Sequence, residues 1–264
     1  MKRNFKRLVV ISDMHCGHAV GLTPPNWQYP ADPETHRGKI GLMQKTMWDW
    51  YAKEIKQLKP IDIIVCNGDA IDGKGDRSGG TEQITTDREQ QVEMSAQCIK
   101  LAEAKKILLI YGTAYHTGAL EDWEQNLFHA VRAEKIGSHE WVDINGFIFD
   151  FKHHIGNSSI PHGRFTQLAK DKLWNDEWYL KEKRQPNSDV IVRSHVHEFR
   201  EVRTTGWRAL TTPALQGYGS KFGARRCSGL IEIGFVYFDV FKDGISCNVI
   251  GLQSDILQAN VLQW

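Results

Sequence analysis

Short apolar runs alternate with longer amphipathic stretches in the first half of the chain. Leu8–Ile11, Ile61–Cys66 and Ile107–Tyr111 are almost wholly apolar, which is typical of strands buried on both faces. Between them, Ile40–Leu58 carries apolar residues at helical spacing, and a second helix is expected over about 87–104. This order of strands and helices predicts right-handed βαβ units and a parallel sheet.

The second half of the chain has a pattern more typical of antiparallel strands. Two strand-like segments, 142–144 and 147–152, flank Asn145-Gly146, a strong signal for a hairpin with a type I′ turn. A helix is expected over about 165–183 and a short strand at Val190–Arg193. From Arg200 onward, strand-like runs alternate with turns.

No change of composition marks a domain boundary. We therefore predict one α/β domain over residues 1–264, in which two β-sheets pack face to face as a sandwich with helices outside. A Pro- and Trp-containing loop is inserted at about 18–38, and the C-terminal part is rich in strands. Long loops of this kind are more often functional than idle, although a packed Ω-loop explains it as well.

Charge and cysteine content exclude several classes of protein. The 264 residues contain 33 Lys and Arg against 32 Asp and Glu, so the net charge of +1 argues against a bulk basic nucleic-acid coat. No apolar stretch reaches the ~20 residues that span a bilayer, and we expect no membrane association. The 5 cysteines are widely spaced and form no CxxC, which favours a reducing, cytoplasmic environment over a disulfide framework.

Polar residues follow five of the predicted strands at the points where the strands end, which is the edge where α/β sheets form their sites. Each motif alone also fits a turn, a helix cap or one face of a strand. Together they place a carboxylate or an imidazole at every one of these ends, which no local rule requires. Ligands of this type without cysteine favour Mn, Fe, Zn, Co or Ni over Ca, and two metals over one. The motifs are Asp13-Met14-His15, Gly68-Asp69 with Asp72, Gly112-Thr113 with His116, His153-His154, and Ser194-His195-Val196-His197.

The order of these motifs resembles that of the calcineurin-like metallophosphoesterases, over the segment from Asp13 to His197. The resemblance implies a two-metal site in a β-sandwich flanked by helices, a four-layer architecture. It implies that one metal would be held by Asp13, His15, Asp69 and His197. It implies that the other would be held by Asp69, His154 and His195.

Two positions depart from the family pattern. The family usually has Gly-Asn-His after the third strand, whereas Thr113 follows Gly112 here and the histidine comes only at His116. The second metal is then weaker, completed by water, or held partly by His116. Ser194 stands where the family usually has a glycine before the last His-x-His motif.

The residues alone leave His153 and His154 open as the ligand after the hairpin. Phe147, Phe149 and Phe151 share parity with His153, so a regular strand would turn them all to one face. We nevertheless expect His154, because it lies nearer the loop.

The expected chemistry follows from two neighbouring cations, which polarise a phosphoryl oxygen and activate a water as hydroxide for in-line attack on phosphorus. His116 is the candidate catalytic residue, which protonates the leaving oxygen or stabilises developing charge. Asp72 either orients a ligand or caps the following helix. Arg225 lies in a Gly-rich segment that could hold phosphate, although an exposed turn with solvated charges explains it equally well.

These observations predict a metal-dependent phosphoesterase with two divalent ions, Mn being the first choice. We expect a phosphodiesterase that acts on nucleotide or nucleic-acid substrates. The alternative among enzymes is a phosphomonoesterase acting on a protein or a small molecule. The alternative from another class is a scaffold that binds metal without turnover, which Thr113 brings into consideration. Oligomeric state and native metal are left open.

Overall fold

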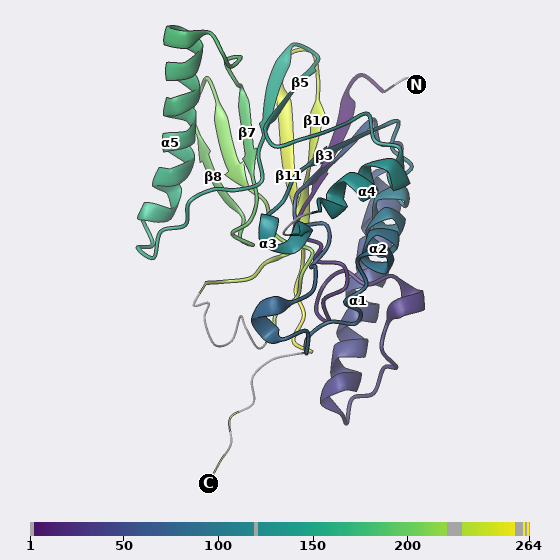
Figure 1. Cartoon of the computed structure of the whole chain (residues 1–264). Helices are drawn as coiled ribbons and strands as arrows, with labels where there is room; N and C mark the ends of the chain where they lie inside the picture. The colour runs from purple at the N-terminus through teal and green to yellow at the C-terminus, as the bar shows by residue number, and fades with distance from the viewer. Residues whose placement is uncertain (1–2, 119–120, 221–228, 257–260, 262, 264) are drawn as a thin grey trace.

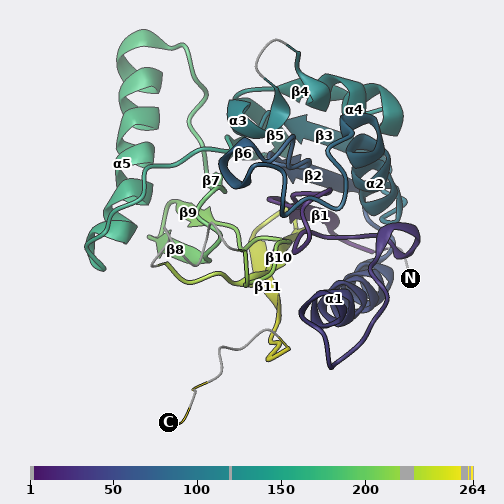
Figure 2. The ribbon, with the colours of Figure 1, turned by 60° about the horizontal axis from the view of Figure 1, so that its bottom comes forward.

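Two β-sheets lie face to face, and helices cover the outer side of each (Figure 1 and Figure 2). The structure is a computed structural model, and it describes residues 3–118, 121–220, 229–256, 261 and 263. The layers follow the order helices, sheet, sheet, helix, so the predicted sandwich flanked by helices is confirmed.

The first sheet has the strand order β11-β10-β1-β2-β3-β4. Strands β1 to β4 are parallel, whereas β10 and β11 run antiparallel along the β1 edge. The parallel sheet predicted from the first half is confirmed, and the last hairpin of the chain extends it. The strands are β1 (Lys6–Ile11), β2 (Ile63–Asn67), β3 (Lys106–Ile110), β4 (Lys135–Gly137), β10 (Ile233–Val240) and β11 (Ile245–Leu252).

The second sheet has the strand order β5-β6-β7-β9-β8. The predicted hairpin is confirmed, and Asn145 and Gly146 have positive φ angles of 56° and 92°, as a type I′ turn requires. Within this sheet, the expectation of antiparallel strands is right only for the two outer strands, because β6, β7 and β9 are parallel. It is also right for β10 and β11 of the first sheet. The strands are β5 (Glu140–Ile144), β6 (Phe147–Phe151), β7 (Val190–Arg193), β8 (Arg200–Arg203) and β9 (Arg208–Thr211).

Three of the helices begin at a side-chain cap, which the sequence places directly in front of the helix. The side chains of Thr35, Asp87 and Asp122 accept hydrogen bonds from the first turns of α1, α2 and α4, which cover the first sheet. Helix α5 covers the second sheet and continues into a π-helical turn at Trp178–Glu182. The helices are α1 (His36–Leu58), α2 (Arg88–Lys100), α3 (Ala114–Thr117), α4 (Trp123–Val131) and α5 (Gly163–Glu177), with 3-10 turns at Pro25–Trp27 and Asp76–Ser78.

Alternate residues of the central strands serve two separate cores. Val9 and Ile11 of β1 pack beneath the helices of the first sheet, whereas Leu8 and Val10 pack between the two sheets. Both faces of β1 are therefore apolar, which explains its unbroken hydrophobic run. A third, smaller cluster lies between α5 and the second sheet.

The Pro- and Trp-containing loop packs on α1. The side-chain amide of buried Gln44 accepts a hydrogen bond from the backbone N–H of Tyr29 at 2.8 Å and donates to the carbonyl of Ala19 at 2.7 Å. Trp27 packs against the core under α1, so this part of the loop is a packed Ω-loop. The extent of one domain over residues 1–264 stays a prediction. In the part of the chain that the structure describes, no helix is long and apolar enough to cross a membrane.

Candidate metal centre

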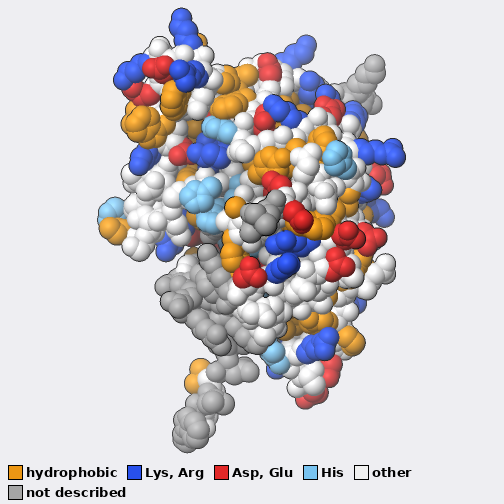
Figure 3. All heavy atoms as spheres, in the orientation of Figure 1, with side chains coloured by type: hydrophobic (Ala, Val, Ile, Leu, Met, Phe, Trp, Pro, Cys, Tyr) orange, Lys and Arg blue, Asp and Glu red, His pale blue; other side chains and the backbone are white. Residues whose placement is uncertain are grey.

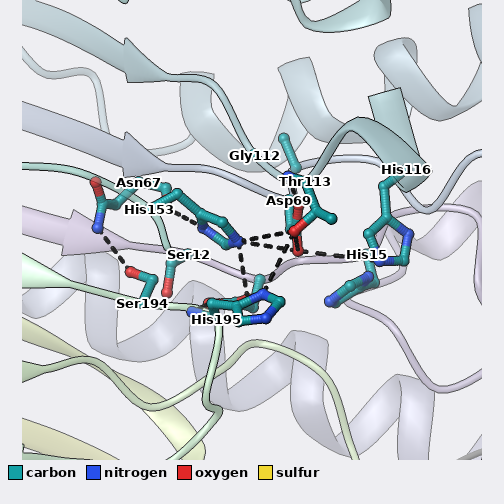
Figure 4. A network of polar contacts seen from close by, with 12 residues as sticks. Ser12, His15, Asn67, Asp69, Gly112, Thr113, His116, His153, Ser194 and His195 are labelled. Carbon is teal, nitrogen blue, oxygen red and sulfur yellow. Dashed lines mark hydrogen bonds and ion pairs between the residues drawn. The ribbon is translucent and has the colours of Figure 1, made fainter. Parts of the chain in front are cut away.

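The carboxyl ends of strands from both sheets bring the predicted motifs together at one edge of the sandwich (Figure 4). Three overlapping sets of side chains place their ligand atoms within 4.8 Å of one another. Asp69 belongs to two of these sets, and so does His15. The sets are Asp13, His15 and His197; His15, Asp69 and His116; and Asp69, His153 and His195.

The backbone is strained at the residues of this cluster. Nine non-glycine residues of the described chain have positive φ, and five of them belong to the cluster. This conformation is uncommon for residues with a side chain and persists only where the surroundings enforce it. Here the loops after β1 and β2 hold each other, because the N–H groups of Asp13 and His15 donate to the carbonyls of Gly68 and Asp69 at 3.0 Å. The five residues are Asp13, His15, Asp69, His195 and His197.

Two glycines are required by the close packing around Asp69. A Cβ atom on Gly68, which has a φ of 90°, would lie 2.4 Å from Nδ1 of His153. A Cβ on Gly112 would lie 2.2 Å from the backbone nitrogen of Asp69. Both glycines in the sequence motifs therefore allow the ligand loops to approach one another.

Asp13 is fully buried, yet its Oδ1 atom accepts no hydrogen bond within the described chain. This oxygen lies 3.2 Å from Nε2 of His197 and 4.0 Å from Nε2 of His153. Burial raises the pKa of the Asp13 carboxyl, but the interactions with His197 and His153 together outweigh this effect and lower the pKa to about 2. A buried, ionised and unsatisfied carboxylate oxygen is costly alone and fits a cation in contact with it.

His153 and His15 present their Nε2 atoms to the cluster, because their Nδ1 atoms are used elsewhere. Nδ1 of His153 donates to the carbonyl of Asn67 at 2.7 Å, and its Nε2 lies 3.1 Å from Oδ2 of Asp69. Nδ1 of His15 donates to the carboxylate of Asp72 at 2.8 Å. Nε2 of His15 then lies 3.4 Å from Nε2 of His197. An imidazole whose Nδ1–H donates a hydrogen bond to a carbonyl or carboxylate, so that Nε2 is directed at the site, is typical of metal ligands.

Without a metal ion, protons balance the charge of the buried carboxylates. Burial lowers the pKa of His153, but Asp69, Asp13 and the carbonyl of Asn67 together outweigh burial and raise the pKa to about 10. The same competition, with Asp72 as the main partner, raises the pKa of His116 to about 9. Divalent cations would take over this role and displace protons from the ligands, so the donor set fits them.

The structure brings His153, and not the expected His154, together with Asp69 and His195. His153 is 2% exposed and joins the set of Asp69 and His195, whereas His154 is exposed and its ring packs 4.7 Å from that of His195. The cause is strand alternation. Phe149 and Phe151 face the space between the sheets, and His153 continues on the same face past the end of β6.

Thr113 lies in the middle of the set formed by Asp69, His153 and His195. Its backbone N–H donates to Oδ1 of Asp69 at 2.5 Å, and its hydroxyl donates to Oδ2 at 3.2 Å. The same hydroxyl lies 3.4 Å from both Nε2 of His153 and Nδ1 of His195. Thr113 therefore fixes the carboxylate of Asp69 by two hydrogen bonds. It also places a neutral hydroxyl at the position where the calcineurin-like metallophosphoesterase pattern has an asparagine amide.

Asp72 orients histidines and does not cap a helix. One carboxylate oxygen accepts from His15 at 2.8 Å and lies 3.4 Å from Nδ1 of His116. The other accepts from the side-chain amide of Gln83 at 2.6 Å. Helix α2 begins only at Arg88.

Several residues that support the site were missed by the sequence analysis. A buried chain of hydrogen bonds joins the ends of four strands, with each step at 2.7 Å, and runs from Asn67 through Ser194 and Thr212 to Ser12. The sequence contains one signal for this chain of hydrogen bonds, namely that Asn67 directly precedes Gly68-Asp69. The three hydroxyl residues lie far from Asn67 in the sequence, so their contacts could not be predicted. Ser194, a departure from the family pattern, thereby has a structural role.

Glu124 of α4 was missed as well. It is 2% exposed and accepts hydrogen bonds from the backbone N–H groups of Ala70 at 3.2 Å and Gly112 at 2.6 Å. Burial raises the pKa of this carboxyl to about 7. Glu124 therefore fixes the loops that follow β2 and β3 on either side of Asp69.

A cleft of about 640 Å³ opens from the histidines of the centre. His116, His195 and His197 form its floor, and Figure 3 shows histidine side chains reaching the surface beside α5. The segment from Asn157 to Arg164 contributes to one wall. The predicted phosphate contact Arg225 lies outside the described residues.

Sequence comparison finds no matching family model and no similar curated protein. Solved structures with a similar chain path include Vps29 of Chaetomium thermophilum, which is 13% identical over 96% of this chain and 91% of that chain, with a TM-score of 0.49. A predicted phosphoesterase of Streptococcus pneumoniae is 9% identical over 94% and 90% of the two chains, with a TM-score of 0.41. An archaeal phosphodiesterase is 14% identical over 92% and 99%, with a TM-score of 0.45. Each activity named here is that of the similar protein.

The four layers and the converging motifs decide the fold. The chain has the metallophosphoesterase-like architecture that its motif order predicts. Three sets of side chains suited to divalent metal ions lie where the motifs meet at the edge of the sandwich.

Proposed function

We propose that this protein is a metal-dependent phosphodiesterase that acts on nucleotide or nucleic-acid substrates and uses two divalent cations, Mn²⁺ being the first choice. The observation that carries the proposal is the unsatisfied, buried Oδ1 atom of Asp13 within a cluster of histidine Nε2 atoms. The proposed first cation contacts Asp13, His15 and His197, and the second contacts His153 and His195. Asp69 lies close to His15 of the first group and to both histidines of the second, so it is the proposed bridge between the cations.

The bound cations supply a polarised phosphoryl oxygen and a water of lowered pKa. Residues of the protein itself would supply the proton for the leaving oxygen. Asp72 holds Nδ1 of His116, which leaves Nε2 of this ring for the leaving oxygen at the floor of the cleft. The proposed role of His116 is to donate a proton there, a step typically worth ~10²–10⁴-fold in rate.

The cleft supports a diester over a small monoester. A volume of about 640 Å³ accommodates a substituent on each side of a phosphate, and one wall carries hydroxyl and amide groups from Asn157, Ser158 and Ser159. The proposed location is the cytoplasm, which is supported by the four described cysteines, all of them free thiols.

A metal-binding scaffold without turnover is the second candidate. It is favoured by one observation, the hydroxyl of Thr113 at the position where an amide ligand would strengthen the second cation site. Activity with normal metal content would exclude it.

The test compares hydrolysis of bis-p-nitrophenyl phosphate and p-nitrophenyl phosphate by the full chain with added Mn²⁺. The proposal expects Mn²⁺-stimulated cleavage that is faster for the diester. Asp243→Asn serves as the matched control for site variants, because Asp243 is an exposed carboxylate in the β10–β11 turn. Faster cleavage of the monoester would favour the phosphomonoesterase, and metal binding without cleavage of either would favour the scaffold.

A further inference from the structure

Arg164 is the arginine of the described chain that lines the cleft beside the metal centre. It lies in the first turn of α5, on the wall that the second sheet contributes, and its side chain is 23% exposed. The carboxylates that line the same cleft, Asp72 and Glu82, come from the segment after β2 of the first sheet. The cleft is therefore polarised, with positive charge on one wall and negative charge on the other.

The charge of Arg164 is only partly neutralised. Its Nη1 donates to Oε2 of Glu198 at 3.2 Å, and Arg200 donates to the same oxygen. Arg200 is 4% exposed and also donates to the side chain of Asn157 at 3.4 Å. Two guanidinium groups thus share one carboxylate, which leaves one positive charge in excess at this wall.

The hydrogen-bonding capacity of Arg164 is also incompletely used. Within the described residues, Glu198 is the one partner of its side chain and is bound through Nη1, which leaves the donors of Nη2 for a ligand in the cleft. Ser158 and Ser159 line the cleft next to it. A guanidinium with spare donors, an excess positive charge and adjacent hydroxyls is suited to an oxyanion, above all to phosphate.

We propose that Arg164 binds a second phosphate of the substrate, adjacent to the one that is cleaved. This inference rests on the proposed function and deepens it, because it makes the preferred substrate a phosphodiester that carries a further phosphate group. The second phosphate comes either from the end of a short nucleotide or from the next linkage of a strand, since both present the same oxyanion to the guanidinium.

The experiment uses the full chain with Mn²⁺ and three substrates: a thymidine dinucleotide with its single linking phosphate, the same dinucleotide with a terminal 5′-phosphate, and the unphosphorylated trinucleotide. We expect the second phosphate to raise kcat/KM by roughly 10- to 100-fold, as charge-assisted hydrogen bonds allow. A higher kcat/KM with the 5′-phosphorylated dinucleotide alone would identify the second phosphate as that of a nucleotide end. A higher kcat/KM with the trinucleotide would identify it as the next linkage of a strand.

The variant Arg164→Met should abolish this preference through KM, while cleavage of bis-p-nitrophenyl phosphate and metal content stay unchanged. Arg164→Lys should restore part of the preference, because it retains the charge. Lys170→Met is the matched control, since Lys170 is an exposed cation on the same helix. A purely structural role of Arg164 would lower all activities together and leave the ratio between substrates unchanged.

The inference is overturned if the wild-type protein does not distinguish the substrates, or if Arg164→Met retains the preference. Binding of the dinucleotides to Mn²⁺-loaded protein, followed by calorimetry, separates this inference from the proposed function. Tighter binding of the 5′-phosphorylated dinucleotide that disappears in Arg164→Met, without turnover of any ester, would sustain the phosphate contact and refute the catalysis. Equal binding of both dinucleotides would refute the contact.

Discussion

Two buried clusters of charged residues differ in whether their members satisfy one another. Beneath α5, Arg193 is 2% exposed and donates to the carboxylates of Asp150 and Asp171 at 2.6 Å each. The same Asp150 oxygen lies 2.9 Å from Nε2 of His139. In the candidate metal centre, Oδ1 of Asp13 accepts no hydrogen bond from the residues that the structure describes. We call the first cluster closed, because its charged groups pair with one another and so stabilise the fold. We call the second cluster open, because it contains this unsatisfied carboxylate oxygen, which is suited to bind a cation.

The two clusters lie at the end of one strand. Arg193 is the last residue of β7, and His195 follows two residues later with a φ of 73°. The closed network anchors the end of β7 under α5. This anchor lets the following loop hold His195 and His197 in strained backbone conformations.

Loss of Asp69 should have the largest effect and distinguish the clusters most clearly. Asp69→Asn removes the charge proposed to contact both cations, so we expect metal content to fall for both proposed sites and the proposed phosphodiesterase activity to fall by several orders of magnitude. Elemental analysis and the bis-p-nitrophenyl phosphate assay measure these effects, with Asp243→Asn as control. Activity retained near the wild-type level would sink the two-cation account.

His116→Asn should leave the cations in place but slow the reaction. Because His116 is the proposed proton donor, kcat should fall by ~10²–10⁴-fold. Metal content should stay at the wild-type level. Loss of metal in this variant would instead make His116 a ligand.

Substitution of His153 and of His154 should have different effects on metal binding. His153→Ala should remove one cation, because the buried Nε2 atom of His153 lies 3.1 Å from Asp69. His154→Ala should change metal content and activity little, because this side chain is exposed. Metal titration of both variants checks the assignment, and the reverse pattern would restore His154 as the ligand.

Asp150→Asn probes the closed cluster and should affect stability alone. Breaking a buried ion pair costs about 3 kcal/mol, measured by chemical denaturation, while metal content should not change. Loss of metal binding in the folded variant would contradict the separation of the two clusters.

The pH dependence of this effect has a defined sign. Burial raises the pKa of Asp150, but Arg193 and His139 together outweigh burial and lower the pKa from 3.8 to about 2. The carboxylate therefore stabilises the fold fully above pH 3.8, by about 2 kcal/mol, and loses this contribution as the pH falls through about 2. The stability difference between wild type and Asp150→Asn should shrink over this range, and a constant difference would refute the assignment.

The fold and most of the centre follow from local patterns in the sequence. The runs at Leu8–Ile11 and Ile61–Cys66, the Asn145-Gly146 turn and the polar residues at strand ends all report structure within a few residues. Two kinds of feature could not be predicted in this way. The bonds of Glu124 to Ala70 and Gly112 are made between distant segments, and the choice of His153 over His154 depends on how far β6 stays regular.

The most direct test of the central claim is the number of metal ions per chain, measured by elemental analysis on protein purified without chelator and then supplied with Mn²⁺. The account predicts close to two ions per chain in the wild type and a loss of both in Asp69→Asn. A wild-type protein that binds no metal ion under these conditions would contradict it.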